Sequence, residues 1–390
     1  MFQTSLRFLE IFSAICACAS IAYYCFCIWS AVKFLHAIKH ARPADFHPPV
    51  SILKPLKGID SSMYEAFRTH CLPDYREYEI IFGVSEADDP ALRVVEELQK
   101  EFPGACIQSV VCEKELGTNV KVSNLVQMLE IATHEHIVVN DADISVPPNY
   151  LSRIMAPLAD SKVGLVTCLY RGVPARSLYS RLEALGVNTD FVAGVLVAEQ
   201  LEDGLSFGLG STLAFRKRDL QAAGGFEKFL DYLADDYELG RSIAASGQKV
   251  VLSECVVQTS VGDYGRKQFF EHQLRWSRTI RDARRWGYLG FGVTFGIWWA
   301  LLALIASRGA VWSWALLGVV LAARGAVAGL VGWRVLHDRT VLSFPYLIPV
   351  RDVAAFWTWL AGWFGGRVKW RGQEYVLKRG RLVRATRETL

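Results

Sequence analysis

The residues whose types and spacing most clearly suggest chemistry are Asp141 and Asp143, in a segment that follows an apolar stretch. In an open α/β sheet, ligands bind beyond the carboxyl ends of the strands. Alternate residues at a strand end can direct two carboxylates at one divalent cation. Mg²⁺ and Mn²⁺ prefer oxygen ligands and commonly hold substrate phosphates as well. The segment therefore indicates a cation site, and a solvated turn or a helix cap is the alternative interpretation.

Two further acidic clusters strengthen this interpretation. Glu86-Ala-Asp88-Asp89 lies at the end of a second apolar strand pattern, and Asp235-Asp236 opens a helical pattern. Each cluster taken alone is also compatible with a helix cap. Together they give three acidic sites, two of them directly after strands. Carboxylates can act as ligands of a metal ion and as a general base.

Two other segments are candidates for substrate contacts. Arg275 and Trp276 lie in the basic, aromatic segment Glu271–Arg278. Arginine can neutralise a departing diphosphate and tryptophan can stack on a sugar or lipid, whereas a basic helix lying on anionic lipid is the alternative. The segment Gly208–Thr212 is not a phosphate-binding P-loop, because no Gly-Lys-Ser/Thr follows it. It predicts a tight turn beside an acceptor cavity, or a plain hairpin.

The elements that must position these residues alternate along the chain from Val50 to about Ser260. This alternation of strand-like and helix-like segments predicts an α/β fold with a mostly parallel sheet and helices on both faces. About 200 residues are enough to bury a full core. The clearest segments are the strands Val50–Lys54, Glu79–Ser85 and His136–Asn140 and the helices Met63–Cys71 and Pro90–Phe102.

The composition indicates a soluble domain joined to a few membrane segments. The chain of 390 residues is 52% hydrophobic and 21% charged, with a mean hydropathy of +0.20. This is too apolar for an ordinary soluble protein and too charged for a purely membrane-embedded one. A net charge of +4 is too small to indicate nucleic-acid binding. The nine cysteines contain no CxxC pair, which favours reduced thiols in a protein that faces the cytosol.

An N-terminal membrane helix is predicted by the segment Leu9–Phe34, which is almost uncharged and long enough to span a bilayer. Lys33, Lys39 and Arg42 lie at its end and place the following segment in the cytoplasm. A cleaved signal peptide is the alternative. It is disfavoured because the apolar segment is too long and is followed by these cations.

Further membrane segments are predicted near the C-terminus. The apolar runs Gly290–Ala306 and Ala310–Trp333 indicate an out-and-back pair of membrane helices. A third run, Phe344–Gly366, is interrupted by Arg351 and Asp352, which are costly to bury in lipid. We therefore expect this run to be re-entrant or interfacial, with Arg351 near the catalytic mouth, and a genuine span is the alternative.

The chain accordingly divides into five expected parts. A linker with three prolines begins at Arg42, and Gln268–Trp286 has the composition of an interfacial helix. The parts are a transmembrane helix and linker start (1–42), a cytosolic catalytic domain (43–265), an interfacial amphipathic helix (266–288), a membrane region (289–366) and a basic cytosolic tail (367–390).

The acidic and basic motifs together resemble those of a known group of enzymes. In order, Asp88-Asp89, Asp141-Ala-Asp143, Asp236 and His272-x-x-Arg275-Trp276 resemble the D, DxD, D, (Q/R)xxRW pattern of family 2-like glycosyltransferases. More narrowly, four stretches resemble the ceramide glucosyltransferase family, and within it the bacterial relatives in hopanoid biosynthesis. These stretches are Val50–Gly58, Gly117–Leu125, Asp231–Tyr237 and Trp370–Gly372. The resemblance covers nearly the whole chain.

This resemblance implies a GT-A catalytic domain and an inverting mechanism. It implies that Asp88 or Asp89 holds the uridine end of the donor and that Asp141 lies at the donor. Asp143 would coordinate a divalent cation, Mg²⁺ or Mn²⁺, and Asp236 would act as the general base.

The resemblance also suggests contacts outside the acidic clusters. Arg275 would stabilise the departing UDP, and Trp276 and Ser211 would line the acceptor site. Lys121 and Asn124 would share one helix face and meet the phosphate or uracil of the donor, with a plain surface face as the alternative. The family motif begins with Gln or Arg where this chain has His272, so His272 is either an acceptor contact or a structural histidine. Gln273 is shifted by one and should point elsewhere.

The expected partners are a UDP-sugar, a membrane lipid acceptor and the bilayer, with no nucleic acid. We expect transfer of N-acetylglucosamine to a polyhydroxylated hopanoid, with ceramide and UDP-glucose as the second choice. The expected location is a bacterial inner membrane, with the catalytic domain facing the cytoplasm. The rival hypotheses are a processive polysaccharide synthase and a non-catalytic membrane receptor or scaffold.

Overall fold

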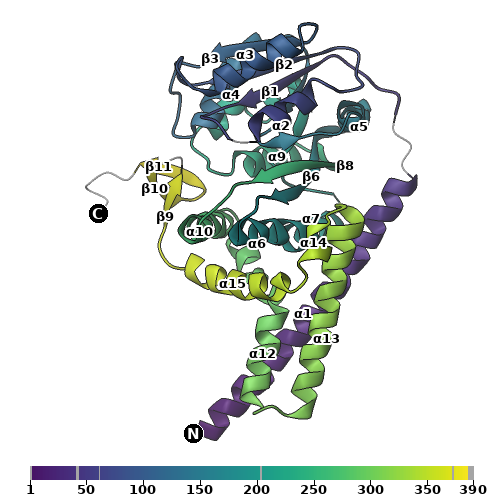
Figure 1. Cartoon of the computed structure of the whole chain (residues 1–390), viewed down its shortest axis with the longest axis vertical. Coiled ribbons are helices and arrows are strands. Elements are labelled where there is room, and N and C mark those ends of the chain that lie inside the picture. The colour runs from purple at the N-terminus through teal and green to yellow at the C-terminus, as the bar shows by residue number, and fades with distance from the viewer. Residues whose placement is uncertain (1, 41–43, 61, 203, 371–372, 385–390) are drawn as a thin grey trace. The chain divides into compact units, whose positions relative to one another are not determined.

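The computed structural model describes residues 2–40, 44–60, 62–202, 204–370 and 373–384 (Figure 1). The predictions for Arg42, for Arg371 and Gly372 of the Trp370–Gly372 motif and for the end of the basic tail lie outside the described residues. The chain forms two compact units. Unit 1 comprises Met1–His40, Gly172–Gln200 and Val261–Glu374, and unit 2 comprises Ala41–Arg171, Leu201–Ser260 and Tyr375–Leu390. Residues 172–200 therefore belong to unit 1, whereas the sequence analysis placed them in the predicted catalytic domain (43–265).

Unit 2 is built on a mixed sheet. Within the described residues, eight strands follow the order β3-β2-β1-β4-β7-β6-β8-β5. β1 pairs in parallel with both β2 and β4, and β2 pairs in parallel with β3, while the β4/β7, β6/β7 and β5/β8 pairs are antiparallel. The strands are β1 (Val50–Pro55), β2 (Tyr78–Val84), β3 (Cys106–Val111), β4 (His136–Val139), β5 (Ile144–Ser145), β6 (Val163–Pro174), β7 (Leu213–Arg216) and β8 (Lys249–Val261).

The first three helices of unit 2 connect β1 to β2, β2 to β3 and β3 to β4, the parallel strands, as the alternating pattern predicts. The strands and helices predicted between Val50 and Asn140 all lie within about a residue or two of the observed ones. The helices are α2 (Met63–His70), α3 (Ala91–Glu101), α4 (Val120–Ile131), α5 (Tyr150–Met155), α8 (Lys217–Ala222) and α9 (Asp235–Ala245), with short 3₁₀ turns at Ala156–Ala159 and Phe226–Phe229.

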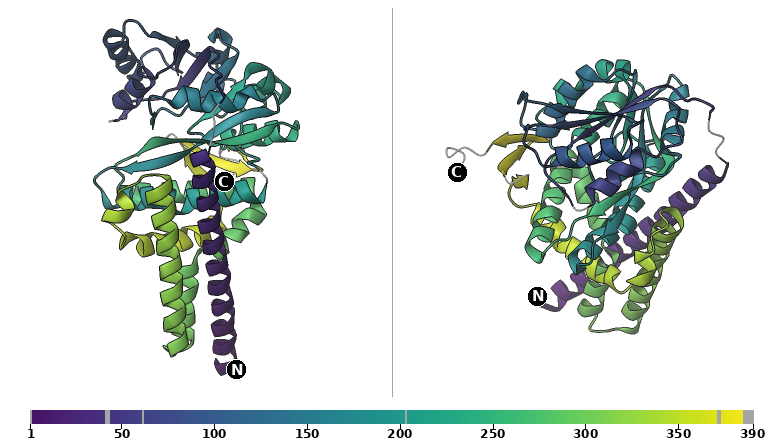
Figure 2. Two further views of the ribbon diagram at one scale, coloured as in Figure 1. Left: turned by 90° about the vertical axis from the view of Figure 1, so that its right-hand side faces the viewer. Right: turned by 45° about the horizontal axis from the view of Figure 1, so that its top comes forward.

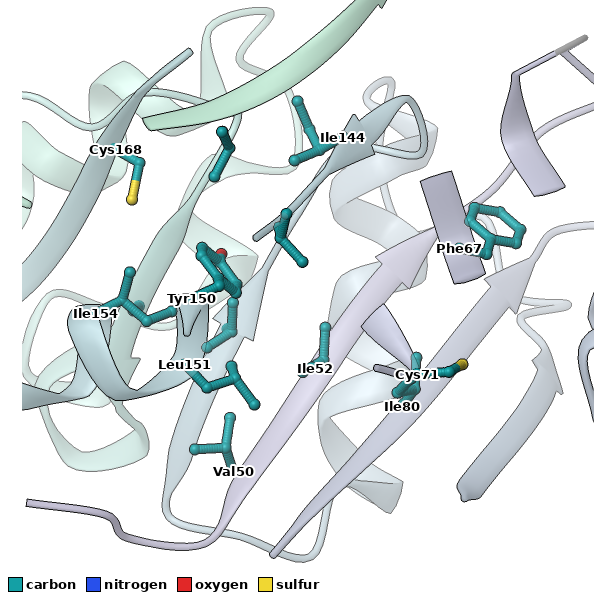
Figure 3. Packing of buried hydrophobic residues seen from close by; sticks show 14 of the residues in the cluster. Val50, Ile52, Phe67, Cys71, Ile80, Ile144, Tyr150, Leu151, Ile154 and Cys168 are labelled. Atoms are coloured by element: carbon teal, nitrogen blue, oxygen red, sulfur yellow. The ribbon is translucent and has the colours of Figure 1, made fainter. Parts of the chain in front are cut away.

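The core of unit 2 lies between the parallel strands and the helices that cover them (Figure 3). Every residue of β1 is buried, and so is all of β2 except its first residue. Phe67 of α2 packs on Phe82 of β2 with ring centroids 4.6 Å apart. Burying each such side chain contributes about 1.5–3 kcal/mol. Gly83 completes the fit, because a Cβ there would lie 2.4 Å from the sulfur of Met128 in α4.

Unit 1 contains the long apolar helices. α1 (Phe2–His40), α12 (Gly296–Ala306) and α13 (Val311–Val327, continued by a π-helix, Ala328–Val335) pack side by side (Figure 2). Among the described residues, Gln3–His40 and Val311–Val335 are long and apolar enough to cross a membrane. The predicted run Gly290–Ala306 is not one straight helix. Arg285–Thr294 and Gly296–Ala306 meet at a bend of 57° and would make a third span only if counted together.

The remaining helices of unit 1 are shorter and partly polar. α15 (Leu347–Gly362) packs on α6 (Leu178–Gly186) and α10 (Arg266–Ala283) and does not have the length and composition of a span. The helix predicted at residues 266–288 is observed as α10 followed by a short second helix, α11 (Arg285–Gly290). The other elements are a π-helix at Val187–Phe191, α7 (Val192–Leu201), a 3₁₀ turn at Phe291–Thr294 and α14 (Thr340–Ser343).

The two charges that interrupt the third apolar run both have partners within unit 1. Asp352 accepts two hydrogen bonds from Arg324 of α13, at 2.7 and 3.0 Å. Arg324 also donates to the carbonyl oxygen of Thr189, at 3.1 Å. Arg351 forms an ion pair with Asp190, at 3.2 Å. Because buried charges are tolerated when paired and hydrogen-bonded, these contacts explain how α15 carries them.

The described residues of the predicted basic tail form strands, which the sequence analysis did not predict. β9 (Arg367–Trp370), β10 (Gln373–Lys378) and β11 (Arg381–Arg384) make a small sheet in the order β11-β10-β9. Tyr375, Leu377 and Leu382 are buried. In β10, buried Tyr375 and Leu377 alternate with exposed Glu374, half-buried Val376 and exposed Lys378, which is the period of a strand. The net positive charge of the segment hid this alternation.

Candidate active site

The Asp141–Asp143 pair follows β4, as the sequence predicts. Asn140, fully buried, anchors the strand end by donating to the carbonyl oxygen of Ser211 at 2.6 Å and to the hydroxyl of Tyr150 at 2.8 Å. Asp143 accepts a hydrogen bond from the hydroxyl of Thr259 in β8. Both carboxylates are partly exposed. Hydrogen bonds of Asn140 and Asp143 therefore fix the position of the pair, while its carboxylates stay accessible to a ligand.

Lys121 connects this pair to a second acidic segment. Its Nζ lies 2.8 Å from Oδ1 of Asp141 and 3.2 Å from Oδ2 of Asp235. Burial alone would lower the pKa of Lys121, but Asp141 and Asp235 raise it above its ordinary value. The lysine is therefore a fixed positive charge that holds the carboxyl end of β4 to the start of α9.

Asp236 follows directly and is the candidate base. Its Oδ2 accepts from the backbone N–H of Gly210 at 2.7 Å, and its Oδ1 accepts from that of Tyr237 at 2.8 Å. A Cβ on Gly210 would lie 2.9 Å from Oδ2 of Asp141 and 3.1 Å from Oδ2 of Asp236, so a glycine lets the two carboxylates approach the same turn.

The environment of Asp236 suits a base that works near neutral pH. Burial and the neighbouring Asp235 raise the pKa of Asp236 to about 6, although Lys121 opposes this shift. A catalytic base is most effective when its pKa lies near the working pH. Asp236 is then ionised at pH 7 but still basic enough to accept a proton.

Lys54 is a residue of this site that sequence reasoning missed. It is fully buried, and its Nζ donates to the carbonyl oxygen of Asp141 at 3.1 Å and lies 3.4 Å from Nε2 of His70. Burial lowers the pKa of Lys54 to about 7, and Asp143 and Asp141 act in the opposite direction. A lysine within the apolar strand Val50–Pro55 was the available signal.

The donor set at Asp141 and Asp143 fits a divalent cation that is shared with a ligand. Among the described residues, no group of three or more His, Cys, Asp or Glu side chains could hold a metal ion. Burial and the charge of Asp141 raise the pKa of Asp143, because the two carboxylates lie close together. Mg²⁺ is commonly held by one or two carboxylates together with substrate phosphates. The two oxygen donors present match that arrangement.

The predicted uridine contacts at the end of β2 differ from one another. Both oxygens of Asp89 accept from the backbone N–H of Gly58 at 3.1 Å, and Oδ1 also accepts from Ala91 at 2.9 Å. Asp89 is therefore occupied in joining the loop after β1 to the start of α3. Asp88 is exposed, which leaves it accessible to a ligand.

Lys121 and Asn124 do not form a plain surface face, so that alternative is wrong. Both are buried in the first turns of α4. Asn124 accepts from the hydroxyl of Ser85 at 3.1 Å, and its Nδ2 has no hydrogen-bond partner among the described residues. An unpaired buried donor costs about 1–3 kcal/mol. Asn124 thus offers a free donor beside the end of β2.

Ser211 lies in the predicted turn but is occupied by the protein. The turn is closed by a hydrogen bond from the N–H of Thr212 to the carbonyl oxygen of Leu209, at 3.0 Å. The buried hydroxyl of Ser211 donates to the carbonyl oxygen of Cys168, also at 3.0 Å. Its side chain therefore holds the turn against β6.

The remaining predicted residues lie on α10 in unit 1. His272 lies 3.0 Å from Glu183 of α6, and Gln273 donates to the same carboxylate at 3.5 Å. The expectation that Gln273 points elsewhere is wrong. Trp276 packs against Phe191 and the ring of His272, with centroids 6.0 and 5.5 Å away.

Arg275 stands apart from these packed residues. Its guanidinium forms no hydrogen bond or ion pair with the part of the chain that the structure describes, and burial lowers its pKa. By contrast, Arg278 donates to the carbonyl oxygens of Phe364, at 2.9 Å, and of Arg367.

All nine cysteines are free thiols, as predicted.

The fold is that of a GT-A glycosyltransferase. The mannosyltransferase PcManGT from Pyrobaculum calidifontis, solved in complex with GDP-Man and Mn²⁺, matches it with a TM-score of 0.56. That match has 20% identity and covers 90% of this chain and 99% of that one. The chain belongs to glycosyl transferase family 21, whose profile matches residues 12–383.

Curated relatives of known activity are distant. Ceramide glucosyltransferase 3 of Caenorhabditis elegans is 26% identical over 230 residues, which cover 59% of this chain and 50% of the relative. Ceramide glucosyltransferase of Komagataella phaffii is 30% identical over 108 residues, covering 27% and 21%. The chain spans about half the length of the two nematode relatives that it matches.

Proposed function

We propose that this protein transfers one sugar from a UDP-sugar to the hydroxyl group of a membrane lipid, with inversion at the anomeric carbon. The observation that carries the proposal is the meeting of Asp141, Lys121 and the Asp235–Asp236 pair at the carboxyl end of β4. In an α/β sheet this edge is where ligands bind. The carboxylates there would supply a base and ligands for a cation.

The proposed reaction is a direct displacement. Asp236 removes the proton from the lipid hydroxyl, and the oxygen attacks the anomeric carbon opposite UDP. The bond from that carbon to the diphosphate oxygen breaks as the new bond forms, and UDP leaves with the electron pair. An α-linked donor then yields a β-linked glycolipid, without a covalent enzyme intermediate.

A divalent cation held by Asp143, with Asp141 beside it, would neutralise charge on the diphosphate. Asp88, Asn124 and Lys121 remain the predicted donor contacts, whereas Asp89 would act by joining the loop after β1 to the start of α3. Arg275 remains the predicted stabiliser of UDP. Its support is the half-buried guanidinium that no described residue binds. Such an arginine can pair with a phosphate in bidentate fashion.

A lipid acceptor is supported by the two helices with the length and composition of membrane spans. Trp276 and His272 remain predicted acceptor contacts, while Ser211 would act only by holding its turn. The first candidate pair is UDP-N-acetylglucosamine and a polyhydroxylated hopanoid. The similarity to ceramide glucosyltransferases favours a second pair, UDP-glucose and ceramide.

The test is a transfer assay with purified protein in lipid nanodiscs. Each donor is incubated with each acceptor, UDP release is measured, and the lipid products are identified by mass spectrometry. We expect UDP release coupled to a glycolipid that carries one β-linked sugar. Long polymer would identify a polysaccharide synthase instead. No release with any of the four combinations, from protein shown to be folded, would support the receptor or scaffold hypothesis.

A further inference from the structure

The acidic segment that carries Asp235 and Asp236 is held by the loop before α4. Asn119, fully buried, accepts backbone hydrogen bonds that cap α4, including one from Lys121 at 3.1 Å. Its Nδ2 donates to the carbonyl oxygen of Tyr232 at 2.6 Å and lies 3.3 Å from Oδ1 of Asp235. One side chain thus joins the start of α4 to the start of α9.

A second contact joins the same two segments. Oδ1 of Asp231 accepts from the backbone N–H and the hydroxyl of Thr118, at 3.0 and 2.9 Å. The backbone N–H of Asn119 donates to the carbonyl oxygen of Leu230 at 2.7 Å. The acidic segment is therefore tied along its length, with bonds at Leu230, Asp231, Tyr232 and Asp235.

The C-terminal strands hold the other side of the acidic segment. The N–H of Leu382 in β11 donates to the carbonyl oxygen of Asp231 at 2.7 Å, and the N–H of Leu233 donates to that of Gly380 at 3.1 Å. The guanidinium of Arg381 lies over the ring of Tyr232, 5.1 Å from its centroid. Leu382 is buried.

We propose that Asn119 and the hairpin formed by β10 and β11 are positioning elements of the active site. They set the place of the Asp235–Asp236 carboxylates and of the Lys121 bridge. This inference rests on the proposed role of Asp236 as the base. A base acts only within hydrogen-bond reach of the proton, and a displacement of about 1 Å can cost roughly 10²-fold in rate.

The contacts distinguish this role from that of a surface tail. They are backbone hydrogen bonds to residues three to five positions before Asp236, and they continue into α4 through Thr118 and Asn119. The hydroxyl of Thr118 also lies 3.2 Å from the carbonyl oxygen of Leu382. Three segments far apart in sequence therefore meet in one hydrogen-bonded layer next to the candidate base.

The first experiment compares two amide-to-acid variants, one at the N-cap of α4 and one within the helix. Asn119→Asp keeps the oxygen that caps α4 but replaces the donor facing Tyr232 and Asp235 by a negative charge. Gln127→Glu makes the same change in α4 itself, where the amide of Gln127 contacts the backbone of Lys114. We expect Asn119→Asp to lower kcat by on the order of 10²-fold, with the donor KM within about threefold of wild type. Equal kcat in both variants would overturn the role of Asn119.

The second experiment removes the hairpin. A protein ending at Glu374 is compared with one ending at Arg384, which keeps β10 and β11. Hydrogen exchange is followed by mass spectrometry at Leu233, whose N–H loses the carbonyl of Gly380. We expect faster exchange at residues 230–236 and lower kcat in the shorter protein only. Unchanged exchange or unchanged kcat in a folded shorter protein would overturn the role of the hairpin.

The exchange measurement also separates this inference from the proposed function. It requires no turnover, so it reports the protection of the amides of residues 230–236 even if the wild-type protein transfers no sugar. In that case the proposed function fails by the transfer assay. Should the shorter protein not fold, Arg381→Ala removes the contact between the hairpin and the ring of Tyr232. It gives the same two readouts, and unchanged values would again count against the inference.

Discussion

Replacing Asp236 by asparagine should abolish turnover while leaving the fold and donor binding in place. The two carboxylate oxygens of Asp236 accept from the backbone N–H groups of Gly210 and Tyr237. Asparagine has one acceptor oxygen, so one of these N–H groups would face an NH₂ group. We expect the variant to lose about 1–3 kcal/mol of stability, the cost of an unsatisfied buried donor.

The kinetic loss follows from removing the base. A positioned general base typically contributes about 10²–10⁴-fold, which corresponds to about 2.7–5.4 kcal/mol of transition-state stabilisation. For wild type, protonation should inactivate Asp236 as the pH falls through its pKa of about 6. At about pH 5, roughly a tenth of the molecules would carry the ionised base, so kcat/KM should fall about tenfold below its plateau.

The assay measures UDP release against pH for wild type, Asp236→Asn and Glu238→Gln. The last variant makes the same change in the first turn of α9, where Glu238 pairs with Arg241 at 3.4 Å. Donor binding and thermal unfolding are measured alongside. If Asp236→Asn kept kcat within about threefold of wild type, or kept the inflection near pH 6, Asp236 would not be the base.

Three other predictions concern the cation, the arginine pair and the membrane. Activity should require a divalent cation, and Asp143→Ala should abolish it or raise the cation requirement; full activity in excess chelator would contradict this. Arg275→Ala should lower kcat, whereas Arg278→Ala should mainly lower the unfolding temperature, because Arg278 binds two carbonyl oxygens; equal losses rescued by anionic lipid would favour a lipid-binding helix. A cysteine replacing exposed Lys378 should resist a membrane-impermeant thiol reagent in intact cells, in a protein whose other exposed cysteines are replaced by serine; labelling from outside would refute a cytoplasmic C-terminus.

Much of the catalytic unit could be predicted from short-range patterns. The strands Val50–Pro55 and His136–Val139 consist mostly of apolar residues, and the position of the acidic residues after β4 follows directly from the second strand. The Asp141–Asp143 pair was recognisable because both its position and its spacing are local. The predicted turn at Gly208–Thr212 was equally local, since glycines mark it.

Contacts between distant residues were beyond the reach of such patterns. His272 meets Glu183 across 89 positions and Thr118 meets Asp231 across 113. No periodicity in the sequence encodes either pairing. Lys54 was overlooked because its surroundings come from distant residues, Phe67 and His70 of α2 and Asp141 after β4, rather than from its own strand. The C-terminal strands were missed because their charge suggested a solvated tail.

The buried pair of Arg324 and Asp352 has a consequence for how the helices reach the membrane. An arginine within an isolated membrane helix costs about 2.5–3.5 kcal/mol on insertion scales. Of its partners, Thr189 is synthesised before α13, but Asp352 follows 28 residues after Arg324. We therefore expect the charge of Arg324 to be incompletely neutralised until α15 has been synthesised and Asp352 can pair with it. Stable association of α13 with its neighbours would then depend on a helix that lies later in the chain.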